Sequence, residues 1–289
     1  MIYLKLARPL HLLFLTLAYT LGVAIADYLG APFSASAFLL GLLGLAAAHT
    51  SLNLLAEVFR PANESLPFDS SPAERILLRH RLLLLSIALL TFAASIVYLL
   101  HLAKRLSPAV LMGIGLSLLI VFAHSVPPLR LARRGFGELL LALHIGYIAP
   151  LLAFVLQTGQ FHRLMPILAL PITALILAYL LVLDFTTFAD DLKYERQTLL
   201  TRLGWQRVLR LHHLLLGMAF VLIAGASLQG LSLALLWPAL LALPFALWQI
   251  LLLRNIGLGA RPLWKPLTLL AATLPALTIY LLTLSFFLR

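Results

Sequence analysis

Acidic side chains gather at one point of a chain that otherwise carries little charge. The segment LVLDFTTFADDLKYERQTLLTRLG ends a long apolar run and holds four of the ten Asp and Glu residues, which are Asp184, Asp190, Asp191 and Glu195. If the apolar helix continues through this segment, Asp184, Asp191 and Glu195 fall within about 20° of one another at 100° per residue. Asp190 points to another side. We therefore expect two or three oxygen ligands in one line at the end of a helix.

A second group of polar side chains ends an earlier apolar run. In HTSLNLLAEVF the spacing of His49, Asn53 and Glu57 is i, i+4 and i+8, which places them on one side of a helix. Asn53 and Glu57 can both present oxygen to one ion, and Pro61 stops the helix shortly afterwards. The two acidic helix ends are therefore predicted to be the two halves of a metal site.

These residue types suit Mg²⁺ and phosphate. Mg²⁺ is a hard cation that accepts one or two carboxylates, keeps several waters and takes its remaining ligands from substrate phosphates. Arginine and lysine side chains follow both acidic segments and would neutralise the remaining phosphate charge. A diphosphate attached to a lipid would suit this place, with its tail between the helices. The alternative is that these charges form the solvated salt bridges of ordinary loops.

The elements that carry these groups are predicted to be membrane spans. Hydrophobic residues make up 62% of the 289 residues, more than a soluble core of this length would bury. Nine windows are long and apolar enough to cross a bilayer, and they are 10–29, 36–59, 82–103, 108–125, 138–157, 164–186, 207–228, 231–253 and 266–287. We expect one all-α integral membrane domain over residues 1–289. The chain has no cysteine, so a metal would bind oxygen or imidazole.

The loop charges give this bundle a predicted orientation. If the nine spans alternate, 17 of the 21 Lys and Arg residues lie on one side and 4 on the other. The positive-inside rule then places the N-terminus in the cytoplasm and the C-terminus outside. The net charge of +11 follows from this topology and from anionic lipid, and it does not indicate nucleic acid. Nine of the ten acids share the basic side, so we expect the site at the cytoplasmic face of the inner (cytoplasmic) membrane.

Five segments, in this order, resemble the UbiA superfamily of intramembrane prenyltransferases, and most of all its 1,4-dihydroxy-2-naphthoate polyprenyltransferase branch. They are LARPLHLLFLTL, TSLNLLAEVF, HSVPPLRLARRGFGELLLAL, LQTG at 156–159, and DFTTFADDLKYERQTLLTRLG. The third is the most specific match, because it is similar to the Pro-Pro-x-Arg-Leu and Arg-Gly-x-Gly-Glu segment of the family. The resemblance covers nearly the whole chain.

The resemblance implies an enzyme that uses Mg²⁺ to transfer a polyprenyl group from a polyprenyl diphosphate to an aromatic acceptor. In the branch that matches best, the acceptor is 1,4-dihydroxy-2-naphthoate and the pathway is menaquinone biosynthesis, a quinone pathway. Ionisation of the allylic C–O bond would give a carbocation, which a ring carbon of the acceptor attacks. The protein would mainly stabilise the departing diphosphate and keep water from the cation.

The resemblance also implies roles for individual residues. Two metal ions would be bound, the first by Asn53 and Glu57 and the second by Asp191 and Glu195. The residues assigned to catalysis and to the diphosphate would be Asp184, Lys193 and Arg196. The other substrate-binding residues would be Asn53, Arg60, Arg130, Arg134 and Tyr147.

Two departures from the family pattern concern the metal. The first motif has Glu57 and then Pro61 where the family has two Asp residues, so the next loop would have to supply an acid, from Glu64 or Asp69. The second motif ends in Glu195 where Asp is usual. Two other functions therefore stay open: a catalytically impaired family member that binds prenyl lipid, and a secondary transporter. Transporters bind their substrates near the bilayer midplane, whereas these acids lie at one surface.

The histidines carry weaker expectations. His212 and His213 are adjacent, so their side chains diverge by about 100° on a helix and do not suit a shared metal. His124 and His144 are expected to be hydrogen-bonded inside the bundle.

Overall fold

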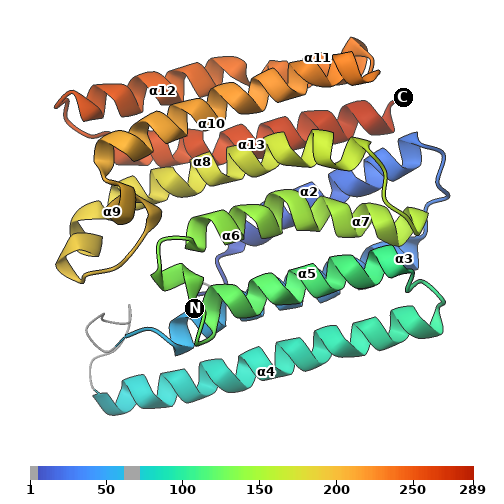
Figure 1. The fold of residues 1–289 in the computed structure, drawn as a ribbon, viewed down its shortest axis with the longest axis horizontal. Coiled ribbons are helices and arrows are strands. Elements are labelled where there is room, and N and C mark those ends of the chain that lie inside the picture. Colours follow the sequence, from blue (N-terminus) through green and yellow to red (C-terminus); the bar gives the residue numbers. More distant parts are fainter. Residues whose placement is uncertain (1–5, 62–71) are drawn as a thin grey trace.

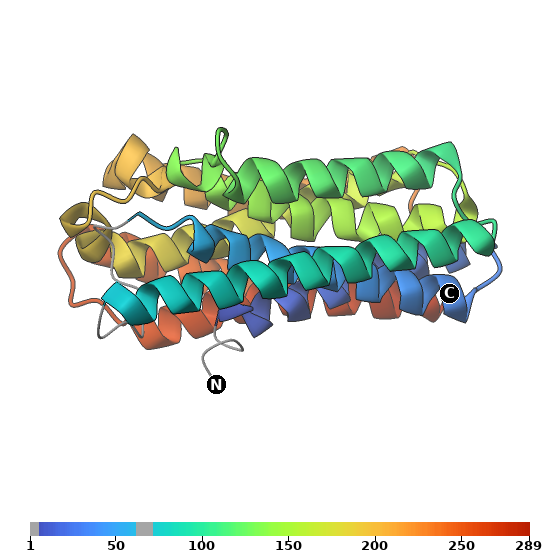
Figure 2. The ribbon, with the colours of Figure 1, turned by 90° about the horizontal axis from the view of Figure 1, so that it is seen from below.

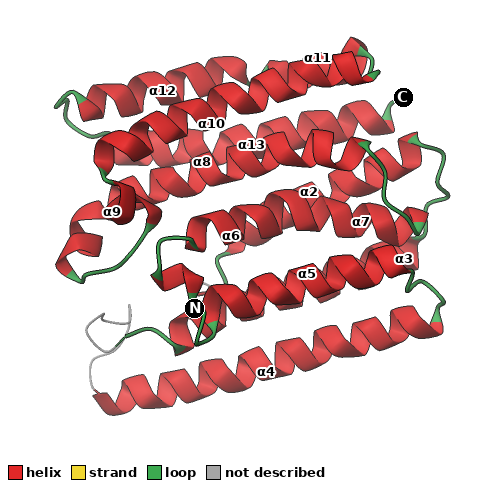
Figure 3. Ribbon diagram, in the orientation of Figure 1, coloured by secondary structure: helices red, strands yellow, loops and turns green. Residues whose placement is uncertain are grey.

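The computed structural model describes residues 6–61 and 72–289, and within these ranges every regular element is a helix (Figure 1, Figure 3). Nine helical segments of the described chain are long and apolar enough to cross a membrane. They run side by side along the long axis of one elongated bundle (Figure 2). The predicted all-helical membrane fold with nine spans is confirmed. Which side of the membrane each end faces stays a prediction.

The elements follow one another up and down the bundle. They are α2 (Pro9–Tyr28), α3 (Ala35–Val58), α4 (Pro72–Leu102), α5 (Pro108–Ser125), η1 (Leu131–Arg133), α6 (Gly137–Leu143), η2 (His144–Ile148), α7 (Ala149–Thr158), α8 (Leu164–Lys193), α9 (Leu199–Leu203), α10 (Trp205–Gly225), η3 (Ala226–Gln229), α11 (Leu233–Leu240), α12 (Leu243–Gly257) and α13 (Trp264–Phe287). Because consecutive spans are antiparallel, the starts of α2 and α6 and the ends of α3, α5 and α8 meet at one end, at left in Figure 1.

Two spans are longer than hydropathy predicts. The helix α4 begins at Pro72 instead of residue 82, and α8 continues to Lys193 instead of residue 186. Both extensions carry charged side chains, which lower the hydropathy of a window although a helix accepts them. Asp184 and Asp191 therefore do lie on one continuous helix, as the spacing argument required.

Prolines interrupt two other spans. The span Gly137–Thr158 consists of α6, the wide π-helical turn η2 and α7. Pro150 has no N–H to donate, and the N–H of Ala149 reaches back to the carbonyl of His144. The last span but one is split into α11 and α12, with a proline in the first turn of α12.

The helix α7 and the middle of α8 form the centre of the bundle. Every residue from Ala149 to Gln157 is buried, and so is every residue from Pro171 to Val182. The helix α4 lies at the edge and packs on α3 (Figure 1). Because α8 is enclosed on all sides, the side chains near its end are held by a rigid support.

The crossing of α2 and α7 depends on Gly22. A Cβ atom at this position would lie 2.1 Å from the carbonyl oxygen of Pro150. We expect Gly22→Ala to reduce the free energy of unfolding by about 2 kcal/mol or more, because backbone cannot yield as a side chain can. Thermal unfolding of the detergent-purified protein measures this as a lower Tm. The matched control is Gly115→Ala, where no heavy atom lies within 4 Å, so the Tm should be equal or higher; equal Tm values for both variants would contradict the tight crossing.

Candidate active site

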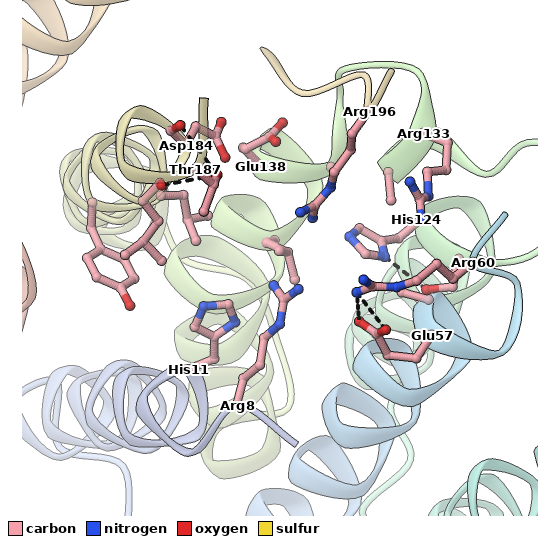
Figure 4. A pocket seen from close by; sticks show the side chains of 18 of the residues that line it. Arg8, His11, Glu57, Arg60, His124, Arg133, Glu138, Asp184, Thr187 and Arg196 are labelled. Carbon is pink, nitrogen blue, oxygen red and sulfur yellow. Dashed lines mark hydrogen bonds and ion pairs between the residues drawn. The ribbon is translucent and has the colours of Figure 1, made fainter. Parts of the chain in front are cut away.

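A cavity of about 420 Å³ lies at the end of the bundle where the acidic helix ends meet (Figure 4). Its walls come from the start of α2, the ends of α3, α5 and α8, the segment around η1 and the start of α6. These elements are far apart in sequence. The antiparallel order of the spans brings them together.

Charged side chains form a large part of the lining. Within residues 6–61 and 72–289, the lining includes five arginines, namely Arg8, Arg60, Arg130, Arg133 and Arg196, and three carboxylates, namely Glu57, Glu138 and Asp184. The guanidinium groups of Arg8 and Arg196 point toward the space between the helices (Figure 4). The cavity is thus a cationic pocket with a minority of acids.

Arg8 is held in position by an uncommon backbone conformation. It precedes α2 with φ 53°, a left-handed conformation that is uncommon for residues other than glycine. The neighbouring carbonyl of Ala7 accepts a hydrogen bond from Asn53 Nδ2 at 3.4 Å, which ties this turn to α3. Burial lowers the pKa of Arg8; Glu57 opposes this shift, and Arg196 and Arg60 add to it.

Arg133 is likewise partly buried and close to other arginines. Burial, and then the neighbouring Arg196 and Arg60, lower its pKa to about 10, so it remains protonated at neutral pH. Cations that depress one another's pKa values repel one another, and an anion that binds among them relieves this repulsion. Binding of an anion is therefore favourable here. The electrostatics therefore suit a ligand of several negative charges, and guanidinium forks match phosphate oxygens in particular.

Glu138, in the first turn of α6, and Asp184, near the end of α8, bring two carboxyl groups together (Figure 4). Glu138 Oε2 accepts a hydrogen bond from the backbone N–H of Leu199 at 3.3 Å. Asp184 Oδ2 is buried and has no hydrogen-bond partner. Two adjacent carboxylates repel each other unless they share a proton or bind a cation. This pair of hard oxygen ligands therefore fits Mg²⁺.

Glu138 and Asp184 would fill only part of the coordination shell of a Mg²⁺ ion. Among the residues that the structure describes, no group of three or more His, Asp and Glu side chains is arranged to hold a metal ion. An ion at Glu138 and Asp184 would take its remaining ligands from water and from a bound phosphate, as Mg²⁺ usually does.

A model of the UbiA prenyltransferase family matches residues 15–265, which is most of the chain. The chain belongs to this family. Membership confirms the expected superfamily, and with it the expectation of a membrane prenyltransferase. A search of curated proteins found no match.

Several solved structures have the same fold. A UbiA homologue from Archaeoglobus fulgidus bound to GPP and Mg²⁺ is similar with a TM-score of 0.67 and 16% identity, over 98% of this chain and 99% of that one. The same homologue bound to DMAPP and Mg²⁺ gives a TM-score of 0.62 at 16% identity and the same coverage. A structure described for digeranylgeranylglyceryl phosphate synthase gives 0.55 at 18% identity, over 100% of this chain and 98% of that one. At these identities the likeness establishes the fold.

The first motif of this UbiA protein does not present an open metal site. Both carboxylate oxygens of Glu57 lie against one nitrogen of Arg60, with Nη2–Oε1 at 2.7 Å and Nη2–Oε2 at 2.6 Å. Asn53 sits one turn deeper in α3 and directs its amide at Ala7. Glu64 and Asp69, the alternative ligands, lie outside the described residues.

The second motif is divided between two hollows. Asp184 faces the cavity, whereas Asp191 and Glu195 line a second hollow of about 630 Å³, and Arg196 borders both. Asp191 is buried and bonded within its own segment, to Thr187 Oγ1 at 3.0 Å and to Arg196 Nη1 at 3.4 Å. Asp184 and Asp191 therefore line different hollows in this structure.

The expected alignment of Glu195 with the two aspartates is wrong, because α8 ends before it. Glu195 has φ 52°, its N–H donates to Leu192 O at 3.3 Å, and the N–H of Arg196 donates to Asp191 O at 2.8 Å. This is the Schellman pattern of a helix end, with Glu195 where glycine is usual. The reversal carries Arg196 to the border of both hollows and leaves Glu195 exposed.

The structure places the other predicted residues in several environments. Arg130 lines the cavity but donates to the carbonyl of Phe59 at the end of α3. Arg134 borders the second hollow and donates to Pro128 O at 3.0 Å. Lys193 is exposed, with its ammonium over the ring of Tyr194. Tyr147 lines a separate hollow beside His162 and Arg163, toward the opposite end of the bundle.

Three charged residues of the lining were not predicted from the sequence, namely Arg8, Arg133 and Glu138. Glu138 carried a usable signal, because it is an acid at the first turn of an apolar span, in the segment GFGELLLAL. The LQTG segment, in contrast, lies at the far end. There Gln157 accepts a hydrogen bond from Ser34 N at 2.9 Å and donates to Ser34 O at 3.3 Å, so it fixes the connection between α2 and α3.

Buried histidines line and underlie the cavity. His11 and His124 belong to its walls, and His124 is hydrogen-bonded to Ser125 Oγ at 2.9 Å. His144 is hydrogen-bonded to His49 at 3.0 Å and to Ser117 Oγ at 2.8 Å, as expected for a residue inside the bundle. His212 and His213 belong to α10, where His212 is hydrogen-bonded to Gln249 of α12 at 2.8 Å.

Proposed function

We propose that this protein transfers a prenyl group from a prenyl diphosphate to an acceptor, with Mg²⁺ as its cofactor. One observation carries the proposal. The cavity at the end of this UbiA bundle combines five guanidinium groups with the facing carboxyl groups of Glu138 and Asp184. The homologues from Archaeoglobus fulgidus bind GPP or DMAPP together with Mg²⁺, which supports the same ligands here.

The residues divide the work between the diphosphate and the prenyl group. Arg8, Arg133 and Arg196 bind the diphosphate and neutralise the charge that grows on its oxygens as the allylic C–O bond breaks. When bound at Glu138 and Asp184, Mg²⁺ would supply further charge neutralisation as a Lewis acid. The electron pair of the broken bond leaves with the diphosphate, and the acceptor forms the new bond to the allylic carbon and then loses a proton.

Apolar residues protect the reacting carbon. Leu141, Leu180 and Leu183 line the cavity together with Tyr179. Such a wall keeps water from the allylic cation, which would otherwise be quenched to an alcohol. The prenyl chain then extends from the cavity between the helices, into surroundings that are as apolar as the bilayer.

An aromatic acceptor similar to 1,4-dihydroxy-2-naphthoate fits the polar groups in this wall. His11, His124 and Tyr179 offer hydrogen-bonding groups for ring hydroxyls, and Arg8 offers a cation for a carboxylate. The segments that resemble the naphthoate branch support a place in menaquinone biosynthesis. The excess of basic residues at this end supports an active site on the cytoplasmic side of the inner membrane.

An acceptor panel tests the function. The purified protein is supplied with Mg²⁺, with geranyl, farnesyl or longer polyprenyl diphosphates, and with 1,4-dihydroxy-2-naphthoate, 4-hydroxybenzoate or geranylgeranylglyceryl phosphate. We expect acceptor-dependent release of diphosphate and a C-prenylated naphthoate, identified by mass spectrometry. Product from the glyceryl phosphate alone would contradict the aromatic acceptor but keep the transferase. Absence of turnover with every acceptor, together with solute flux in liposomes, would favour a transporter.

A further inference from the structure

We propose that Arg60 takes the place of a metal ion at the end of α3, so that this protein binds a prenyl diphosphate with one divalent cation instead of two. The single ion belongs to Glu138 and Asp184, and the guanidinium of Arg60 supplies the positive charge on the opposite wall. The inference rests on the proposed function, because it describes how the same diphosphate is held.

The geometry of Glu57 is the first observation. Its two carboxylate oxygens converge on a single atom, Arg60 Nη2, at 2.7 and 2.6 Å. A carboxylate that chelates a cation has the same form, with both oxygens directed at one centre. A guanidinium nitrogen thus lies where a bidentate metal ion would lie, and it comes from the next turn of the same chain.

The backbone at the end of α3 is the second observation. The last carbonyls of a helix are oxygen ligands of negative partial charge, which a cation would seek. Here guanidinium groups donate to the three carbonyls that directly follow the last helical residue, Val58: Arg130 to Phe59 O at the C-cap, Arg79 to Arg60 O, and Arg75 to Pro61 O, the last at 2.5 Å. Arginine side chains therefore already bind the carbonyl oxygens at the C-cap and just beyond it, where a metal ion would have to compete with them.

The charge of the cavity agrees with a single ion. With all groups ionised, the five guanidiniums and three carboxylates that the described residues contribute give the lining a charge of about +2. A diphosphate ester carries about −3, so one Mg²⁺ leaves the occupied site at about +1, whereas two would leave about +3. Unbalanced charge is costly in a partly buried site, so the second ion would have to displace Arg60 or bind against repulsion.

Arg60 is suited to this role because a guanidinium has five N–H donors in a fixed fork. Glu57 engages Nη2, and Arg60 also lines the cavity, where its guanidinium would meet a phosphate oxygen. Glu57 is then a positioning residue, which sets the orientation of Arg60. This differs from the metal-ligand role that the family resemblance implied for it.

Counting the ions tests the proposal. Mn²⁺ replaces Mg²⁺, the uncleavable analogue geranyl S-thiolodiphosphate replaces the donor, and electron paramagnetic resonance measures free Mn²⁺ during a titration. We expect one bound Mn²⁺ per wild-type chain. Arg60→Asp creates two acids at i and i+3 and should bind two ions, and the Mg²⁺ dependence of its turnover should become steeper. Two ions on the wild-type chain, or no second ion on a folded Arg60→Asp protein, would overturn the role of Arg60.

A second variant keeps the test decisive if Arg60→Asp fails to fold. Glu57→Gln removes the ion pair without adding an acid, so the number of bound Mn²⁺ ions should stay at one while the KM for the donor rises. Loss of the bound ion in Glu57→Gln would show that Glu57 is a metal ligand and would overturn the proposal. Failure of the wild-type chain to bind the analogue at all would overturn the proposed function as well, so the two failures are distinguishable.

Discussion

Replacement of Asp184 by asparagine is expected to lower the kcat of prenyl transfer by about 10²- to 10³-fold, the usual loss when one preorganised electrostatic group is removed. Asp184 contributes a buried, unpartnered oxygen beside Glu138 in the cavity wall. Asparagine keeps the size of the side chain and removes its charge, so the bundle should fold while the cation loses a ligand. The measurement is diphosphate release over a Mg²⁺ titration, in which the half-saturating Mg²⁺ concentration should also rise.

The matched control for this variant is Asp190→Asn. Asp190 belongs to the same helix but is exposed and does not line the cavity. Its replacement changes the net charge equally and should leave turnover unchanged. Equal losses in the two variants would mean that the general charge of this helix end sets the rate, and full activity of Asp184→Asn would contradict its place in the site.

Removal of the Arg8 guanidinium has the second large expected effect. We expect Arg8→Ala to lower kcat/KM for the donor by about 10²-fold, because the departing diphosphate loses one of its preorganised cations. Burial and the nearby Arg196 and Arg60 all lower the pKa of Arg8, so the cation is held at an electrostatic cost. The Tm of Arg8→Ala should therefore be equal to or higher than that of the wild type, even though binding is lost.

Two further variants separate this role from general effects of charge. Arg163→Ala removes an exposed arginine at the opposite end of the bundle and should behave as the wild type. Arg8→Lys keeps the charge but loses the planar fork, so it should recover only part of the rate. A strongly reduced Tm in Arg8→Ala would contradict the hypothesis that Arg8 serves to bind the diphosphate, since it would show that Arg8 stabilises the fold.

The number, order and helical nature of the spans could be predicted because they follow from hydropathy alone. The membrane requires every backbone group in a span to be bonded internally, which leaves the helix as the available structure for an apolar run of this kind. The boundaries of α4 and α8 could not be obtained in the same way. Their extensions are polar, and a helix outside the bilayer is set by local contacts that hydropathy does not measure.

The sequence predicted at which end of the bundle the candidate site lies, but not which of its residues line the same cavity. The motif residues Glu57 and Asp184 were located correctly at one end of the bundle, because antiparallel spans bring their ends together. The separation of Glu195 from the cavity follows from its left-handed conformation, which ends α8 with a residue that sequence rules do not favour there. Asp191 lies on the same continuous helix as Asp184, but its carboxylate is bonded to Thr187 and Arg196 and lines the neighbouring hollow. Spacing on an ideal helix could not reveal this.

The roles of the individual arginines could not be predicted from the sequence either. Basic residues at a cytoplasmic helix end are already expected from topology, so the sequence does not distinguish an arginine that binds substrate from one that only orients the chain. The structure separates them by their surroundings: Arg8 and Arg133 line the cavity, whereas Arg134 borders the neighbouring hollow. The pairing of Arg60 with Glu57, likewise, depends on side-chain geometry and not on spacing.

We expect the arginine-lined cavity to bind the diphosphate of a prenyl donor. The most direct test is an experimental structure of the protein with geranyl S-thiolodiphosphate and Mg²⁺. We expect both phosphates in the 420 Å³ cavity, in contact with Arg8 and Arg196, and a cation between Glu138 and Asp184. A diphosphate in the hollow beside Asp191 and Glu195, with the cavity left to solvent, would contradict it.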